Sequence, residues 1–312
     1  MHRYRFVLYR PFQLIPVLFG ISVLSFVLVK SIPGDPVRVL LGTKGTPETV
    51  ERIRALYGLD QPLLTQYLLY LKNLSAGEMG QSITFKIPVL PLILERIAPT
   101  LFLVLGSVLL TLAIAVPLAS LAALRRGTKS DHAIRGFTTI GLGIPAFWLG
   151  IMLIIVFSAK LGIFPVSGYG DTVLERLHHL VLPCLTVALA LSAVVTRNLR
   201  ASMIAELDSD HATAARAKGL PESWVFLRHV LPNSLIPAIN LLAVNIGWLI
   251  GGTVVVETVF SLPGMGQLLV RAIFSRDYMV VQGVTLFFAC ATVAVNFIAD
   301  LLTVAADPRV KL

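Results

Sequence analysis

Few side chains in this 312-residue chain stand at a spacing that supports catalysis or metal binding. His178 and His179 come nearest to a metal site, but adjacent residues on a helix point about 100° apart, so the pair is a poor chelate. The two cysteines, Cys184 and Cys290, both lie in apolar runs and form neither a metal-binding spacing nor a disulfide framework. We therefore expect no catalytic residue and no metal site.

The sequence also lacks a nucleotide-binding loop. It contains no Gly-Lys dipeptide, which the phosphate-binding G-x-x-x-x-G-K-[ST] loop requires. Residues 141–146 fit G-x-G-x-x-A, but they lie in an apolar run without the βαβ unit that gives this motif its meaning. We expect no cofactor in this chain, so the energy for any uphill transport would come from a partner.

The segments that contain these histidines and cysteines are mostly apolar. Hydrophobic residues make up 56% of the chain and charged residues 14%, whereas soluble domains have about 45–50% and about 25%. Six runs without a formal charge are each long enough to cross a bilayer core as a helix. We predict an all-α integral membrane protein with six transmembrane helices in the runs Pro11–Val29, Ile97–Leu124, Gly136–Ala159, Leu177–Thr196, His229–Val256 and Tyr278–Ala299.

The basic residues orient the spans. If the amino terminus is cytoplasmic, the cytoplasmic segments carry 14 Lys or Arg residues, and the short segments on the other side carry four. The 67-residue segment 30–96 is set aside because long loops cross the membrane regardless of charge. Both termini are therefore predicted to be cytoplasmic. The net charge of +9 follows from this distribution, so we expect membrane lipid and not nucleic acid as the partner.

The long loop is predicted to contain short helices. Thr46, Pro47 and Glu48 are typical of a helix start, and the helix would run to about Tyr57, with Gly58 as its stop. Pro62 opens a second helix. Its apolar stripe, which we expect to pack on this protein, contains Leu63, Leu64, Tyr67, Leu68 and Leu71. The chain thus divides into residues 1–29, the loop 30–96 and a five-helix core 97–312.

The six runs contain no Asp, Glu, Lys or Arg. Carriers that couple transport to protons or ions usually place ionisable groups at membrane depth. Their absence disfavours such a carrier.

The cytoplasmic loop 197–228 is predicted to form a rigid projection between two spans. Ser209 or Asp210 can cap a short alanine-rich helix through Lys218. Gly219 provides a left-handed stop, and Pro221 blocks continuation. Because the side chains are small, one face of this helix could seat in a groove of another protein. An ordinary amphipathic connector is the alternative.

This loop resembles the EAA loop of ABC-importer permeases, whose pattern is E-A-A-x-x-x-G, nine residues, then I-x-L-P. The matching residues are Ala214, Ala215, Gly219, Leu231 and Pro232. Thr213 stands in place of the family's glutamate, and His229 in place of the isoleucine.

Through further motifs, the chain resembles in particular the first (B-type) of the two permease subunits of the dipeptide, oligopeptide and nickel importers. The likeness covers essentially the whole chain. These motifs are the segments 32–36, 57–62, 254–266, 276–278 and 307–309. The resemblance implies a type I ABC-importer permease fold in the bacterial inner membrane. It also implies a C-type permease partner, two ATPase subunits that bind ATP and Mg, and an extracytoplasmic substrate-binding protein.

By this resemblance, the segment that couples to the ATPase contains Ser209, Asp210, Thr213, Ala214, Ala215, Arg216, Lys218 and Gly219. Polar candidates for the pathway lining are Ser107, Thr111, Asn240 and Asn245. We hypothesise a permease subunit that imports peptides or related small solutes by alternating access. A self-sufficient channel or secondary carrier and a non-transporting membrane scaffold are the alternatives, and the substrate stays open.

Overall fold

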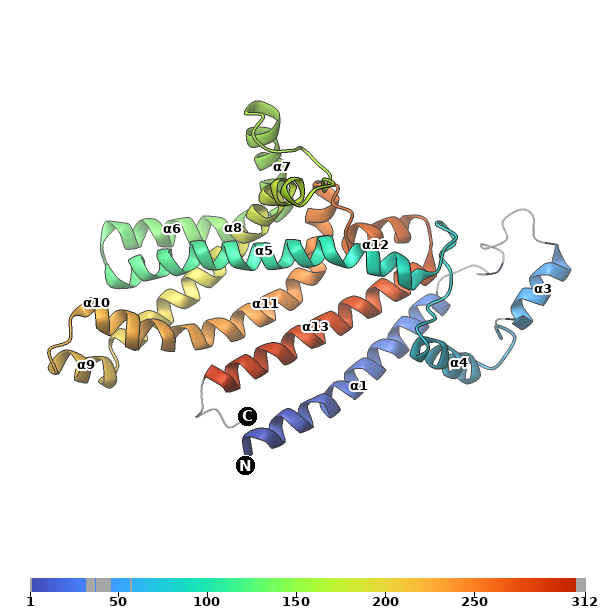
Figure 1. Ribbon diagram of the computed structural model, residues 1–312, viewed down its shortest axis with the longest axis horizontal. Coiled ribbons are helices and arrows are strands. Elements are labelled where there is room, and N and C mark those ends of the chain that lie inside the picture. The colour runs from blue at the N-terminus through green and yellow to red at the C-terminus, as the bar shows by residue number, and fades with distance from the viewer. Residues whose placement is uncertain (1, 32–36, 38–45, 57, 307–312) are drawn as a thin grey trace. The chain divides into compact units, whose positions relative to one another are not determined.

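A computed structural model describes residues 2–31, 37, 46–56 and 58–306. The described residues form helices, and the only strand-like pairing among them is an isolated bridge between Gln81 and Pro88. In order, the helices are α1 (His2–Ser31), α3 (Pro47–Leu56), α4 (Leu63–Ser75), α5 (Val89–Leu124), α6 (Lys129–Gly143), α7 (Ala146–Leu153), the π-helix η2 (Ile154–Lys160), α8 (Val173–Leu207), α9 (Asp210–Ala217), α10 (Glu222–Val225), the π-helix η3 (Phe226–Val230), α11 (Leu231–Val259), α12 (Met265–Phe274) and α13 (Tyr278–Ala306) (Figure 1). The all-α prediction is thus confirmed for these residues.

The chain divides into two compact units. The large unit comprises residues 1–10, 99–267 and 291–312, and the small unit comprises residues 11–98 and 268–290.

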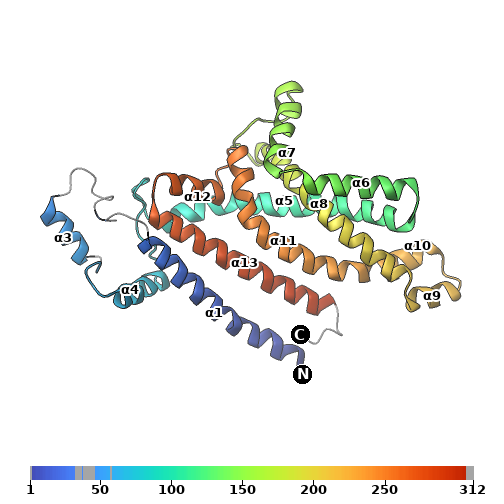
Figure 2. The ribbon, with the colours of Figure 1, turned by 180° about the vertical axis from the view of Figure 1, so that it is seen from behind.

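Within the large unit, α8 is the central helix. It packs against α6, α7 and α11, and α6 and α11 lie beside it in both ribbon views (Figure 1, Figure 2). Apolar side chains from α5, α7, α8 and the end of α11 form a buried cluster that includes Leu103, Leu153, Leu182 and Phe260. The helices approach closely at Gly106, where an added Cβ would lie 2.7 Å from the sulfur of Cys184.

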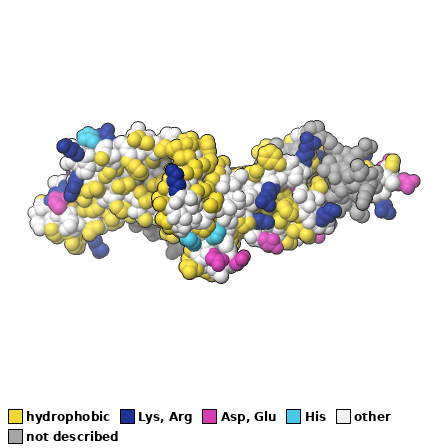
Figure 3. All heavy atoms as spheres, turned by 90° about the horizontal axis from the view of Figure 1, so that it is seen from above, with side chains coloured by type: hydrophobic (Ala, Val, Ile, Leu, Met, Phe, Trp, Pro, Cys, Tyr) yellow, Lys and Arg dark blue, Asp and Glu magenta, His cyan; other side chains and the backbone are white. Residues whose placement is uncertain are grey.

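Several helices are long and apolar enough to cross a bilayer. In the described part of the chain these are α5, α8 and residues Tyr278–Ala299 of α13, with a fourth span if α6 and the α7–η2 segment are taken together. Large apolar side chains on α5, such as Leu101, Leu105 and Leu109, are at least half exposed. Figure 3 shows how widely hydrophobic side chains cover one face of the molecule. Exposed apolar surface on this scale is typical of a protein surrounded by lipid.

The run Gly136–Ala159 is not one continuous helix, and it is a candidate span only if α6 and the α7–η2 segment are taken together. α6 ends at Gly143, and the next helical segment is inclined to it by 103°. Ile144 is extended (φ −87°, ψ 121°) and Pro145 follows it. The proline ring excludes the preceding residue from the helical conformation and removes an amide donor, and this breaks the span.

The predicted helices of the 30–96 loop are present. α3 begins after Thr46, whose Oγ1 accepts a hydrogen bond from the amide of Thr49 at 3.3 Å, and Gly58 has a φ of +63°. Residues 32–36, 57 and 307–309 of the family-like motifs lie outside the described residues.

The expected burial of the α4 stripe is only partly correct. Tyr67 contacts Phe19 and Phe26 of α1 and shares a 2.7 Å hydrogen bond with Ser22. Leu64, by contrast, is 70% exposed, and Leu63 and Leu68 are also more than half exposed. One edge of the stripe therefore packs on α1 while the other edge faces outward.

Candidate functional site

Helix α9 begins at the predicted cap and ends at Ala217, one residue before the predicted end at Lys218. Ser209 is the N-cap residue, and its Oγ accepts a hydrogen bond from the amide of Ala212 at 3.4 Å. At the other end Gly219 has a φ of +80°, and its amide donates to the carbonyl of Arg216. A residue with a Cβ rarely adopts this left-handed conformation, so glycine suits the stop.

The two faces of α9 differ in burial. Ala212 is fully buried and Ala215 is 6% exposed, and both pack into an apolar cluster with Leu199 and Met203 of α8 and Val225 of α10. The spacing of three residues puts both alanines on the same side of the helix. The exposed positions are Asp210, His211, Thr213, Ala214, Ala217 and Lys218. The small exposed side chains leave a slim outer face on a helix whose inner face is anchored.

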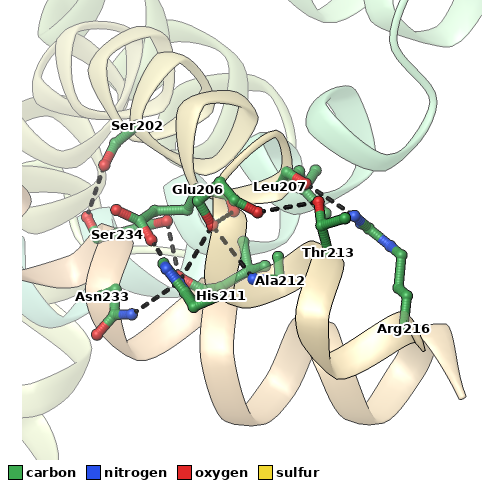
Figure 4. A network of polar contacts seen from close by, with 11 residues as sticks. Ser202, Glu206, Leu207, His211, Ala212, Thr213, Arg216, Asn233 and Ser234 are labelled. Atoms are coloured by element: carbon green, nitrogen blue, oxygen red, sulfur yellow. Dashed lines mark hydrogen bonds and ion pairs between the residues drawn. The ribbon is translucent and has the colours of Figure 1, made fainter. Parts of the chain in front are cut away.

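Polar contacts join the start of α9 to both neighbouring long helices (Figure 4). His211 lies 3.0 Å from the carboxylate of Glu206 near the end of α8, and 3.3 Å from the amide nitrogen of Asn233 in α11. Ser209 Oγ donates to the carbonyl oxygen of Glu206 at 2.5 Å. These contacts attach this end of α9 to α8 and α11.

The other end of α9 is held by Arg216. Its Nε donates to Glu222 Oε1 at 2.7 Å, and one terminal nitrogen donates to the carbonyl of Leu207 at 2.9 Å. Thr213 Oγ1 donates to the carbonyl of Ser209 at 3.1 Å. Of the residues expected at a coupling contact, Ser209, Ala215 and Arg216 thus serve the internal structure. Asp210, Thr213, Ala214, Lys218 and Gly219 face outward.

Sequence reasoning missed an ion pair between α6 and α8. The Arg200 guanidinium donates two hydrogen bonds of 2.7 Å to Asp131, whose side chain is 1% exposed. Asp131 also accepts from the amide of Gly127 at 3.0 Å. Sixty-nine residues separate the partners, so no local spacing could have indicated the pair.

A second buried carboxylate was also missed. Glu257 is fully buried, and it accepts hydrogen bonds from Thr100 Oγ1 at 2.6 Å and from the amide of Gln267 at 3.0 Å. An added Cβ on Gly264 would lie 2.4 Å from this carboxylate. The family-like motif at 254–266 includes both Glu257 and Gly264, so it could have indicated that this carboxylate matters.

The pathway candidates lie at different places. Ser107 and Thr111 are fully buried inside the large unit, and Thr111 donates to the carbonyl of Ser107 at 2.8 Å. Asn245 donates to the carbonyl of Leu241 at 2.7 Å. The side chain of Asn240 lies outside the described residues. Their role in a pathway stays a prediction.

Two family models together match almost the whole chain. The model described as "Binding-protein-dependent transport system inner membrane component" matches residues 115–312. The model described as "Binding-prot-dependent transport system membrane comp, N-term" matches residues 3–115.

Curated proteins resemble the chain over nearly its full length. It is 40% identical over 312 residues to the oligopeptide transport system permease protein AppB of Bacillus subtilis (strain 168), a match that covers 98% of this chain and 99% of that protein. It is 38% identical over 306 residues to the glutathione transport system permease protein GsiC of Escherichia coli (strain K12), with 98% of each chain covered.

Solved structures share the fold. A chain of the MetNI methionine ABC transporter in an inward-facing conformation matches with a TM-score of 0.59 and 17% identity, over 69% of this chain and 96% of that one. A chain of an amino acid ABC transporter matches with a TM-score of 0.54 and 15% identity, over 68% of this chain and 93% of that one. At these identities the likeness concerns the fold alone.

Proposed function

The chain belongs to the family of binding-protein-dependent transport system inner membrane components, and from this premise we propose that α9 is the helix through which an ATPase subunit drives it. The chain is a permease subunit of an ABC importer and is not itself an enzyme. The relatives support this function and not the alternative of a self-sufficient carrier or channel.

The rigid mounting of α9 is the observation that supports this proposal. Ala212 and Ala215 seat the helix on an apolar cluster, and the contacts of His211 and Arg216 hold its two ends. A helix held in this way transmits a displacement to α8 and α11, whereas a loosely attached connector absorbs it. The outer face with Asp210, Thr213 and Ala214 is the part that fits a groove in the ATPase.

Alternating access then follows from the ATPase cycle. ATP binding closes the two ATPase subunits, brings the coupling helices of the two permease chains together and opens the pathway outward. Hydrolysis lets the pathway return inward and release the substrate. Such a two-state change requires a difference in binding free energy of only several kcal/mol between the conformations. ATP and Mg are bound by the partner subunits.

The membership in an ABC importer family entails ATPase and substrate-binding partners in general. We propose specifically a C-type permease chain, two ATPase subunits and an extracytoplasmic binding protein in a bacterial inner membrane. This chain contributes six spans with both termini in the cytoplasm, as the distribution of Lys and Arg predicts. Ser107, Thr111, Asn240 and Asn245 are the candidates for the pathway lining.

The substrate class that we propose is peptides or related small solutes. The support is the printed function of two relatives, an oligopeptide permease and a glutathione permease. The separate binding protein selects among substrates of this class.

Substitution of Gly219 tests the coupling role. Gly219 has a φ of +80°, and an added Cβ would meet nothing within 4 Å, so a substitution strains the backbone without a clash. We expect Gly219→Val to abolish ATP-driven uptake into proteoliposomes, because a β-branched residue disfavours this conformation. Gly219→Asn is the matched control, since asparagine tolerates it, and should retain uptake. Normal uptake by Gly219→Val would contradict the coupling assignment.

Gentle purification from native membranes tests the partners. We expect mass spectrometry to find a second permease chain and proteins with a phosphate-binding loop beside this chain. Recovery of this chain alone, with flux in liposomes, would contradict the proposed assembly.

A further inference from the structure

A cationic cavity of about 640 Å³ lies between α6 and α8 in the large unit. Four arginines line it, namely Arg126, Arg135, Arg197 and Arg200. The hydroxyl-bearing residues of its wall include Thr196, whose Oγ1 is buried and has no hydrogen-bond partner among the described residues. The chemistry of this wall suits an anion that accepts several hydrogen bonds.

Only two of the four positive charges are compensated within the described residues. Arg200 pairs with the buried Asp131, and Arg126 pairs with Asp208 at 3.2 Å. Arg135 and Arg197 have no carboxylate within ion-pair distance in the part of the chain that the structure describes. Asp131 also interacts electrostatically with Arg135, so the four arginines share two carboxylates and the cavity keeps a net positive charge.

The cavity lies at the same end of the large unit as α9. Arg126 of its wall pairs with Asp208, which directly precedes the N-cap residue Ser209 of α9. Farther along α6, Leu142 lies on the face that lines the cavity and is 41% exposed. On the other side of the helix, Phe137 and Ile140 are exposed, at 44% and 67%. Basic side chains at the edge of an exposed apolar surface are typical of the headgroup level of a membrane.

We propose that this cavity binds the phosphate of an anionic phospholipid from the cytoplasmic leaflet. Arg135 and Arg197 contact the phosphate, and the acyl chains lie along Leu142 on the same face of α6. A guanidinium group presents paired donors that match phosphate oxygens, and basic pockets between membrane helices at the cytoplasmic side suit such headgroups. The choice of leaflet rests on the proposed function, because it takes the α9 end of the chain as cytoplasmic.

Lipid retention by the purified importer complex tests this site. The complex is placed in phosphatidylcholine nanodiscs that contain phosphatidylglycerol, and the lipids that stay bound after extraction are identified by native mass spectrometry. We expect preferential retention of phosphatidylglycerol and roughly 30-fold weaker retention in the double variant Arg135→Gln/Arg197→Gln. Lys129→Gln is the matched control, because Lys129 is exposed on the first turn of α6 and does not line the cavity.

Three results of the lipid assay would overturn the proposal. They are equal retention by the double variant, an equal loss in Lys129→Gln, and retention of phosphatidylcholine as strong as that of phosphatidylglycerol. Saturable binding of inorganic phosphate without lipid preference would instead identify a soluble phosphate ligand, which also overturns the lipid source. A thermal melt of each variant complex shows whether lipid is lost with the fold intact. The assay needs no transport, so its outcome is independent of the Gly219→Val uptake test.

Discussion

Arg200 and Asp131 form a two-pronged ion pair that joins α8 to the start of α6, with both hydrogen bonds at 2.7 Å. Asp131 is almost completely buried and Arg200 is 19% exposed. The pair holds α6 against α8, while the break at Ile144 and Pro145 separates α6 from the next segment, α7. It also fixes the position of Arg200 in the wall of the cationic cavity.

Breaking this pair should destabilise the subunit. Asp131→Asn removes one charge and leaves the Arg200 guanidinium without a counter-charge, a change that costs about 3 kcal/mol at a buried pair. Heat denaturation of the purified complex measures the loss. The control is Asp208→Asn, which removes an ion pair whose side chains are 63% and 71% exposed. Such an exposed pair contributes less than about 1 kcal/mol, and an equal loss in the two variants would contradict the prediction.

The two alanines side by side on α9 should respond differently to enlargement. Ala215→Leu inserts carbon atoms into the apolar cluster and should lower stability by about 1–3 kcal/mol. Ala214→Leu lies on the exposed face. It should leave the melting temperature unchanged but weaken co-purification of the ATPase and reduce uptake. Unimpaired uptake by Ala214→Leu would count against docking on this face.

A lysine at position 216 should not replace the function of the Arg216 guanidinium. It reaches Glu222 and the carbonyl of Leu207 at the same time, and lysine lacks this forked geometry. We expect Arg216→Lys to cost about 1 kcal/mol of stability and to reduce coupled uptake. Lys129→Arg, at an exposed position on α6 outside the docking face, is the control and should be close to neutral. Thermal melts and uptake rates that match those of the unaltered complex would refute this role.

Gly264 should not tolerate even a methyl group. A Cβ would lie 2.4 Å from the carboxylate of Glu257, which is fixed by Thr100 and Gln267. Gly264→Ala should therefore lower stability by about 1–3 kcal/mol. Gly136→Ala on α6, where an added Cβ meets nothing within 4 Å, should be neutral or slightly stabilising. Similar melting temperatures for the two variants would contradict this account.

The local features of α9 were predictable because they depend on neighbouring residues. A helix start requires a side-chain acceptor within three residues, and its end requires a residue that tolerates a positive φ. Ser209 and Gly219 meet these needs within the sequence itself. The family-like motif around Ala214 and Leu231 then indicated the function, which the relatives support.

The bend between α6 and α7 shows where local reasoning falls short. Pro145 in the apolar run indicates a bend, because proline removes an amide donor. The angle of 103° does not follow from the proline. It depends on the path that α7 takes against α8 and α11.

By itself, the sequence determined that this protein is a set of apolar helices with a capped alanine-rich helix between two long ones. Those properties depend on composition and on hydrogen bonds that span a few residues. The tertiary structure alone decided that Arg200 meets Asp131, that Thr100 meets Glu257, and which face of α9 is buried. These contacts join residues up to 157 positions apart. No local spacing encodes them, because they form only when the helices pack together.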